Sequence, residues 1–181
     1  NVDRTFNPWH GCTRISPGCD HCYAEELDRI SGGRNWEKHS RRQAMPSEYW
    51  QTPFGWQRRS IRTGQRLRIL CGSMCDVLDN QAPEQQRRKL WSVIKQTPAL
   101  DWLLLTKRAP NMTKMLPPDW NTGYPNVWLG VTVENKKHGL PRIHRLRSIP
   151  AAVRFLSMQP LLEDLGSIDL QGIDWVIAGA E

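Results

Sequence analysis

Three cysteines stand close together near the start of the chain, in the stretch NPWHGCTRISPGCDHCYA (residues 7–24). Cys12, Cys19 and Cys22 are spaced C-x6-C-x2-C. A C-x2-C pair directs two thiolates to one point, a geometry found both at zinc sites and at iron–sulfur clusters. Cys12 can reach the same point because a Pro-Gly pair supplies the turn that closes its six-residue loop. The spacing therefore predicts a metal or cluster site on these thiols.

Three interpretations of the cysteines are open from their spacing alone. They can be incidental thiols, they can bind zinc with His10 or His21 as a fourth ligand, or they can hold a four-iron, four-sulfur cluster. Three thiolates on such a cluster leave one iron open for a substrate or a cofactor. The chain has five cysteines, and this odd, bunched count differs from the even, spread count of a secreted disulfide scaffold. We therefore favour the cluster, with zinc as the alternative.

The composition is that of a globular protein with an excess of positive charge. Of the 181 residues, 39% are hydrophobic and 24% are charged, and the formal net charge is +7. Basic residues group in 40–43, 57–68 and 136–147, which favours a polyanion such as nucleic acid as a partner. No apolar run is long enough to cross a membrane and no signal peptide is evident, so we expect a cytoplasmic protein with no membrane partner. Because the sequence stops in the apolar run VIAGAE, we expect truncation at the C-terminus.

Short, almost continuously apolar runs recur along the chain, as strands buried on both faces should. They lie at residues 4–9, 67–74, 101–107, 126–133, 153–158 and 174–180. Segments with a helical spacing of apolar residues and a nearby proline lie between them, at 83–96, 110–116 and 141–147. This alternation predicts one α/β domain over residues 1–181 with six parallel strands, in an incomplete barrel or a doubly wound sheet. We expect 31–64, rich in Trp and Arg, to be an irregular insertion over one end of the sheet.

Polar residues follow every predicted strand, at the end where parallel α/β folds carry their functional side chains. The three cysteines follow the first strand. The polar residues after the other strands are Ser73, Asp76, Thr106, Lys107, Arg108, Thr132, Glu134, Asn135, Ser157, Gln159 and Glu181. Lys107 and Arg108 could hold a carboxylate or a phosphate. Of the remaining cysteines, we expect Cys71 to be a core thiol and Cys75 to lie where its strand meets the site.

Six blocks of the sequence resemble, in order, those of a phage- and prophage-encoded family that is similar to radical S-adenosylmethionine (SAM) enzymes and has no assigned reaction. The blocks are FNPWHGCTRISPGCDHCYAE, GSMCDVL, WLLLTKR, WLGVTVEN, RFLSMQPLL and DWVIAGAE. The cysteine motif resembles the radical SAM loop, C-x3-C-x-aromatic-C, with a longer first gap and with His21 before the third cysteine. Gln159 stands where family members often have Glu, and the final Gly-Ala-Glu stands where they have Gly-Gly-Glu-Ser and continue.

The resemblance implies a parallel six-stranded partial (β/α) barrel of the radical SAM type. It implies a [4Fe-4S] cluster on the three cysteines and SAM on the open iron. An electron from an external donor would cleave SAM to a 5′-deoxyadenosyl radical, which would act on an unknown substrate. The residues expected to contact the cofactor are His21, Tyr23, Ser73, Asp76, Thr132, Glu134, Ser157 and Gln159.

The positive charge favours a nucleic acid or a nucleotide as the substrate. The alternative from another class is a zinc-binding, non-catalytic, nucleic-acid-binding phage protein. A third interpretation, which Gln159 and the abrupt C-terminus allow, is a family member that keeps the fold and has lost its activity.

Overall fold

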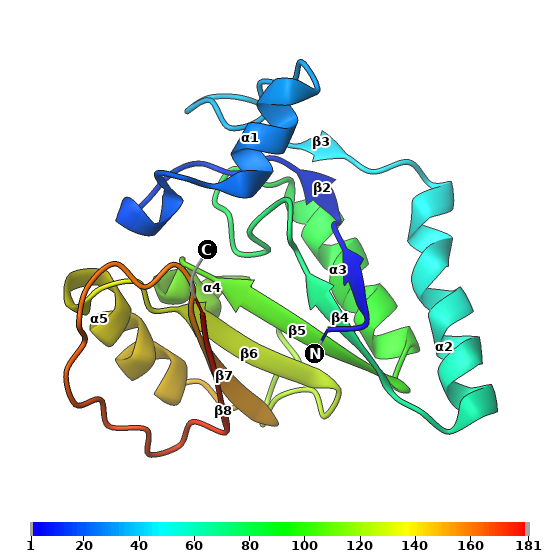
Figure 1. The fold of residues 1–181 in the computed structure, drawn as a ribbon. Coiled ribbons are helices and arrows are strands. Elements are labelled where there is room, and N and C mark those ends of the chain that lie inside the picture. Colours follow the sequence, from blue (N-terminus) through cyan, green and yellow to red (C-terminus); the bar gives the residue numbers. More distant parts are fainter. Residues whose placement is uncertain (1, 180–181) are drawn as a thin grey trace.

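The computed structural model describes residues 2–179 and contains one sheet of six strands, all paired in parallel (Figure 1). The strands occur across the sheet in the order in which they occur along the chain. They are β1 (Arg4–Phe6), β4 (Leu67–Cys71), β5 (Leu100–Thr106), β6 (Val127–Thr132), β7 (Val153–Met158) and β8 (Trp175–Ala178). The predicted α/β class and the six parallel strands are therefore confirmed, while the expected Glu181 lies outside the described residues.

Helices connect the strands and cover one face of the sheet. The longer helices are α2 (Thr52–Thr63), α3 (Glu84–Gln96) and α5 (Lys136–Arg147), with the short α4 (Met112–Met115) and the 3₁₀ turns η2 (Glu48–Gln51) and η3 (Ala109–Asn111) beside them. Alternate strand residues such as Trp102, Leu104 and Leu129 belong to one buried cluster with Leu90 and Ile94 of α3. Because strand side chains alternate between faces, this cluster defines the helix-covered face of the sheet.

The opposite face, which we call the inner face, also carries apolar side chains. Leu103 and Phe155 are fully buried there, and the Trp128 and Trp175 rings meet edge to face with centroids 5.8 Å apart. Gly130 leaves room for the Phe155 ring, since a Cβ at Gly130 would lie 2.3 Å from the nearest ring carbon. These residues fill the inner face below its carboxyl edge.

Two sequence predictions need correction. The predicted strand 4–9 divides into β1 and a separate strand, β2 (Trp9–His10), which pairs antiparallel with β3 (Gln43–Ala44). The segment 31–64, expected to be irregular, contains the 12-residue helix α2. Proline in the first turn of α2 and Gly64, with φ of 69° after its last turn, are ordinary start and stop signals. This helix is the connection that brings β4 parallel to β1.

The other predicted helices are found close to their expected positions. Segment 83–96 is α3, segment 110–116 spans η3 and α4, and segment 141–147 is the second half of α5, which begins five residues earlier and contains Pro141. None of the described helices is both long and apolar enough to cross a membrane. Figure 1 shows α1 (Tyr23–Ile30) and the β2–β3 pair above one edge of the main sheet.

Candidate active site at the carboxyl edge of the sheet

A cavity of about 240 Å³ lies at the carboxyl ends of β4 to β7. Its floor consists of inner-face residues, among them Leu70, Leu105, Thr132 and Ser157. The register of the sheet explains this placement, because Thr132 pairs directly with Ser157 and the two share a face. The segment 11–22, which we call the cysteine loop, lies across the cavity from the sheet and contributes further lining residues.

All three cysteines of the motif line this cavity. Cys12 follows β2, Cys19 ends the 3₁₀ turn η1 (Pro17–Cys19), and Cys22 is the N-cap of α1. None of them is in a disulfide, and each is partly exposed. Gly11 ties the start of the loop to the chain beyond β4, because its N–H donates to Met74 O at 3.0 Å.

The thiols do not form a ready-made site for a single ion. Among residues 2–179, no group of three or more His, Cys, Asp or Glu side chains is close enough together to hold one metal ion. The sulfur atoms of cysteines that bind a four-iron cluster lie farther apart than those that bind one zinc ion, because each thiolate binds a different iron.

A buried guanidinium contacts the first cysteine. Arg108 Nη1 donates to Cys12 Sγ at 3.3 Å and to Asp76 Oδ2 at 3.1 Å. Its Nη2 donates to the carbonyl oxygen and to the hydroxyl of Thr13, at 2.9 and 3.0 Å. Burial raises the pKa of the Cys12 thiol to about 11, although Arg108 acts in the opposite direction. The free thiol is therefore protonated at neutral pH, and a metal would have to displace that proton.

A second buried arginine joins the same network from the other side. Arg42 Nε donates to Asp79 Oδ2 at 2.6 Å, and both side chains are almost completely buried. Arg42 Nη2 also donates to the Thr13 hydroxyl at 3.2 Å. Asp79 lies 3.8 Å from Arg108 Nη2, so two arginines and two aspartates form one buried cluster beneath the cysteine loop. Sequence reasoning missed Arg42, because it saw only a surface basic group at 40–43.

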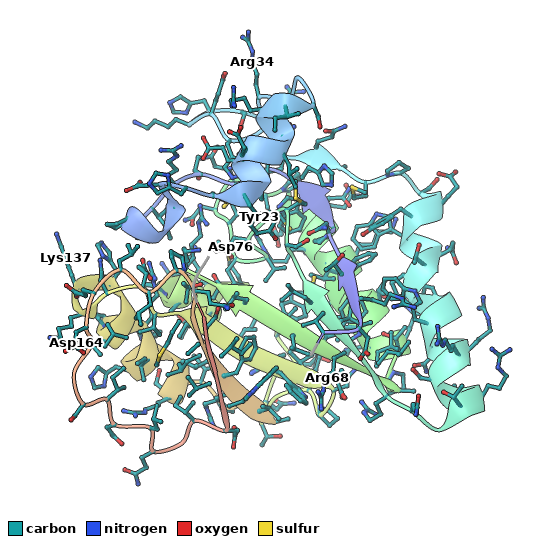
Figure 2. All side chains as sticks on the ribbon, viewed as in Figure 1. Tyr23, Arg34, Arg68, Asp76, Lys137 and Asp164 are labelled. Carbon is teal, nitrogen blue, oxygen red and sulfur yellow. The ribbon has the colours of Figure 1, made fainter. Side chains whose placement is uncertain are left out.

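Tyr23 and Ser73, two of the residues expected to contact a cofactor, both line the cavity. The Tyr23 hydroxyl donates to Ser73 O at 2.9 Å, which links α1 to the segment after β4. Asn7 holds this segment from below, with Nδ2 donating to Ser73 Oγ at 3.1 Å and Oδ1 accepting from Met74 N at 2.7 Å. Figure 2 shows Tyr23 and Asp76 facing the space between α1 and the sheet.

Asp76 lines the cavity, but its carboxylate already accepts hydrogen bonds from other residues of the chain. It accepts hydrogen bonds from the Thr106 hydroxyl at 2.7 Å, from Lys107 N at 3.2 Å and from Leu78 N at 2.9 Å, besides the contact with Arg108. Asp76 therefore fixes the end of β5 against the segment after β4. Lys107 also lines the cavity, and within residues 2–179 no hydrogen bond or ion pair engages its ammonium group, whereas the Arg108 guanidinium is held by Cys12, Thr13 and Asp76.

Thr132, Ser157 and Gln159 line the cavity as expected, whereas Glu134 and His21 do not. The Gln159 amide packs against the end of β8, since a Cβ on Gly179 would lie 2.4 Å from its Nε2. Glu134 is completely buried and pairs with Arg142 of α5. His21 is exposed on the cysteine loop.

Glu134 instead belongs to the support of the cysteine loop. Its partner Arg142 also donates to Thr132 O at 2.9 Å and to Ser16 Oγ at 3.1 Å. Burial alone would raise the pKa of the Glu134 carboxyl, but Ser16 and Arg142 outweigh that effect and hold its pKa below the ordinary value. A Cβ on Gly18 would lie 3.0 Å from Glu134 Cγ, so the loop rests directly on this ion pair.

Comparison with protein families gives one result that covers the whole sequence. A family model described as "Protein of unknown function (DUF5131)" matches residues 1–181. Comparisons with curated proteins and with solved structures gave no significant match. The chain thus belongs to the DUF5131 family of proteins of unknown function.

Proposed function

We propose that this protein is an enzyme of the radical SAM type. Cys12, Cys19 and Cys22 hold a [4Fe-4S] cluster, and SAM binds beside it in the cavity. The observation that carries the proposal is the composition of that cavity, in which three free thiols from one loop lie across from the polar carboxyl ends of parallel strands. Ligand sites occur at this edge in parallel α/β folds.

The order of the strands supports a partial (β/α) barrel. Six parallel strands occur in chain order across the sheet, from β1 to β8. A doubly wound sheet reverses its strand order at an inner switch point, whereas a barrel does not. The apolar filling of the inner face by Leu103, Phe155 and Trp128 agrees with a barrel interior.

The donor set fits an iron–sulfur cluster. Three thiols are free and partly exposed, and Arg108 offers a positive charge and an N–H to one of them. Such a cluster supplies an electron, received from an external donor, that cleaves SAM to a reactive carbon radical. The protein's own part is to bind and orient. The hydroxyls of Ser73, Thr132 and Ser157 offer hydrogen bonds, and Lys107 offers a cation, to the polar groups of SAM.

A polyanionic substrate, nucleic acid or nucleotide, is the class that the charge distribution favours. Exposed cations lie on segments next to the cavity, at Arg34, Lys38 and Arg41 and in the first turn of α5 at Lys136 and Lys137. Figure 2 shows Arg34 and Lys137 projecting outward from two such segments. At the first turn of α5, Lys136 N already donates to the carboxylate of Glu163, so the case for an anionic partner rests on the exposed cations and not on this helix end.

The test is anaerobic purification followed by a visible spectrum and assays for iron, sulfide and zinc. A brown protein with about four irons per chain supports the proposal. Cys19→Ser should lose the chromophore, whereas Cys71→Ala, which removes a completely buried thiol outside the motif, should keep it. Zinc without iron would refute the cluster and favour the non-catalytic alternative. The affinity for labelled DNA or RNA, measured at several salt concentrations, tests the substrate class separately. An affinity that does not fall as the salt concentration rises would count against a polyanionic substrate.

A further inference from the structure

We propose that Arg108 is a positioning residue that holds the Cys12 thiolate and raises the reduction potential of the cluster bound there. This inference rests on the proposed function, because it concerns a cluster on the three cysteines. It assigns to one strand-end cation a task that differs from binding SAM or substrate.

The contacts of Arg108 fix its guanidinium in place. Nη1 lies 3.3 Å from Cys12 Sγ, and Nη2 donates both to the carbonyl and to the hydroxyl of Thr13. Asp76 binds Nη1 from the other side at 3.1 Å, and the side chain is 7% exposed. A guanidinium held at this many points cannot turn away from the sulfur. The planar fork of arginine suits this role better than a lysine would.

The contact is specific to one of the three thiols. Within residues 2–179, no side-chain hydrogen bond reaches the Sγ atom of Cys19 or of Cys22. The protein therefore treats Cys12, the cysteine before the unusually long gap, differently from the C-x2-C pair. The six-residue gap gives the loop room to place Thr13 against Arg108 and Arg42.

The physical effect follows from charge. Reduction adds an electron, so a nearby positive charge and an N–H donated to a ligand sulfur both stabilise the reduced cluster. Burial weakens screening by salt. Asp76 partly offsets the cation, so removal of Arg108 also leaves a carboxylate uncompensated beside the sulfur. Both changes lower the potential. Removal of the carboxylate charge alone should raise it.

The experiment compares reconstituted wild type with Arg108→Gln, Arg108→Lys, Asp76→Asn and Arg42→Gln. The readouts are iron content and the midpoint potential, from redox titration followed by electron paramagnetic resonance. We expect Arg108→Gln to shift the oxidised–reduced equilibrium about tenfold toward the oxidised form, which is about 59 mV more negative for one electron. Arg108→Lys should shift less, because it keeps the charge, and Asp76→Asn should shift in the opposite direction.

Arg42→Gln is the matched control, because Arg42 belongs to the same buried cluster but makes no hydrogen bond to a cysteine within residues 2–179. A shift as large as that of Arg108→Gln would overturn the direct role of Arg108, as would an unchanged potential in Arg108→Gln. If Arg108→Gln fails to fold, Arg108→Lys and Asp76→Asn still test the role of Arg108, because their midpoint potentials should shift in opposite directions. A wild type that takes up no cluster overturns the proposed function and this inference together. If the wild type takes up the cluster but the midpoint potentials of the variants equal that of the wild type, only the inference about Arg108 is overturned.

Discussion

The ion pair between Arg142 and Glu134 supports the cysteine loop. Replacement of Arg142 by Met measures how much this pair and its hydrogen bonds contribute to the free energy of unfolding. The Glu134 side chain is completely buried and the Arg142 side chain is 7% exposed. Arg142 also donates to Thr132 O and to Ser16 Oγ. The substitution removes these bonds and leaves a carboxylate without its counter-charge inside the protein.

The expected cost follows from that burial. Breaking a buried pair from one side costs about 3–5 kcal/mol, because the remaining charge cannot be solvated. A chain of this size loses about 2 kcal/mol of unfolding free energy per molar urea, so the urea midpoint should fall by about 1.5–2.5 M. Glu134→Gln added to Arg142→Met should recover part of the loss, because it removes the stranded charge. The exposed pair of Arg88 and Glu84, with side chains 77% and 71% exposed, is the matched control, and Arg88→Met should cost under about 1 kcal/mol.

The assay is urea unfolding of the metal-free protein followed by tryptophan fluorescence, with each variant at one pH and one salt concentration. Two results would refute the reasoning. The first is an Arg142→Met midpoint no lower than that of Arg88→Met. The second is a double variant less stable than Arg142→Met itself, since then the stranded carboxylate is not the source of the cost.

Three further predictions concern stability. The folded pKa of Glu134 lies below its ordinary value, so the contribution of its carboxylate to the free energy of unfolding is complete above about pH 4.3 and is lost as the pH falls through the folded pKa. Below about pH 4, the urea midpoint should therefore drop more in wild type than in Glu134→Gln. Parallel curves of urea midpoint against pH would contradict this. Gly130→Ala should cost about 1–3 kcal/mol by overpacking against Phe155, a loss that Phe155→Leu partly relieves if the clash is real. Thr97→Val removes the acceptor of the buried Trp102 indole N–H, 3.0 Å away, and should cost about 1–3 kcal/mol in urea unfolding, whereas an unchanged midpoint would mean that the indole finds another acceptor.

The strands of the sheet could be predicted because their signal is local. In β5, all residues from Leu100 to Thr106 except Leu105 are buried, so an apolar run marks the strand directly. The helix α2 was hidden because TPFGWQRRSIRT has few apolar residues and presents only a narrow buried side. Its end signals, Pro53 and Gly64, were present, and they were better guides than its composition.

The location of the candidate site could be predicted from the sequence, but the roles of its individual residues could not. Parallel pairing puts all strand ends at one edge, so Thr132 and Ser157 were expected near the cysteines and are found there. Which polar groups are free depends on contacts between distant parts of the chain. Arg108 lies 96 positions from Cys12 and 32 from Asp76, and no local pattern reports such pairs. The same holds for Glu134, which was expected at the cofactor and is found buried, paired with Arg142 of α5 beneath Gly18 of the cysteine loop.

The way the cysteine loop is held explains why part of the positive charge of the chain is not on its surface. The loop cannot be anchored by apolar burial, since its only large aliphatic side chain, Ile15, is 42% exposed. Three arginines from distant segments anchor it instead, Arg42 and Arg108 at Thr13 and Arg142 at Ser16. Two of them come from 40–43 and 136–147, the groups that the sequence suggested as contacts for a polyanion.

Inward-facing arginines cannot contact nucleic acid, so the case for a polyanion depends on the exposed cations that remain in those groups. Arg41 and Lys137 are exposed, while Arg42 and Arg142, from the same two basic groups, are buried. Substitution of the exposed pair should therefore weaken salt-dependent nucleic-acid binding without a loss of stability. Substitution of the buried pair should unfold the loop, and its effect on binding would carry no information about the surface. The comparison separates a basic surface from a basic interior, which net charge alone does not distinguish.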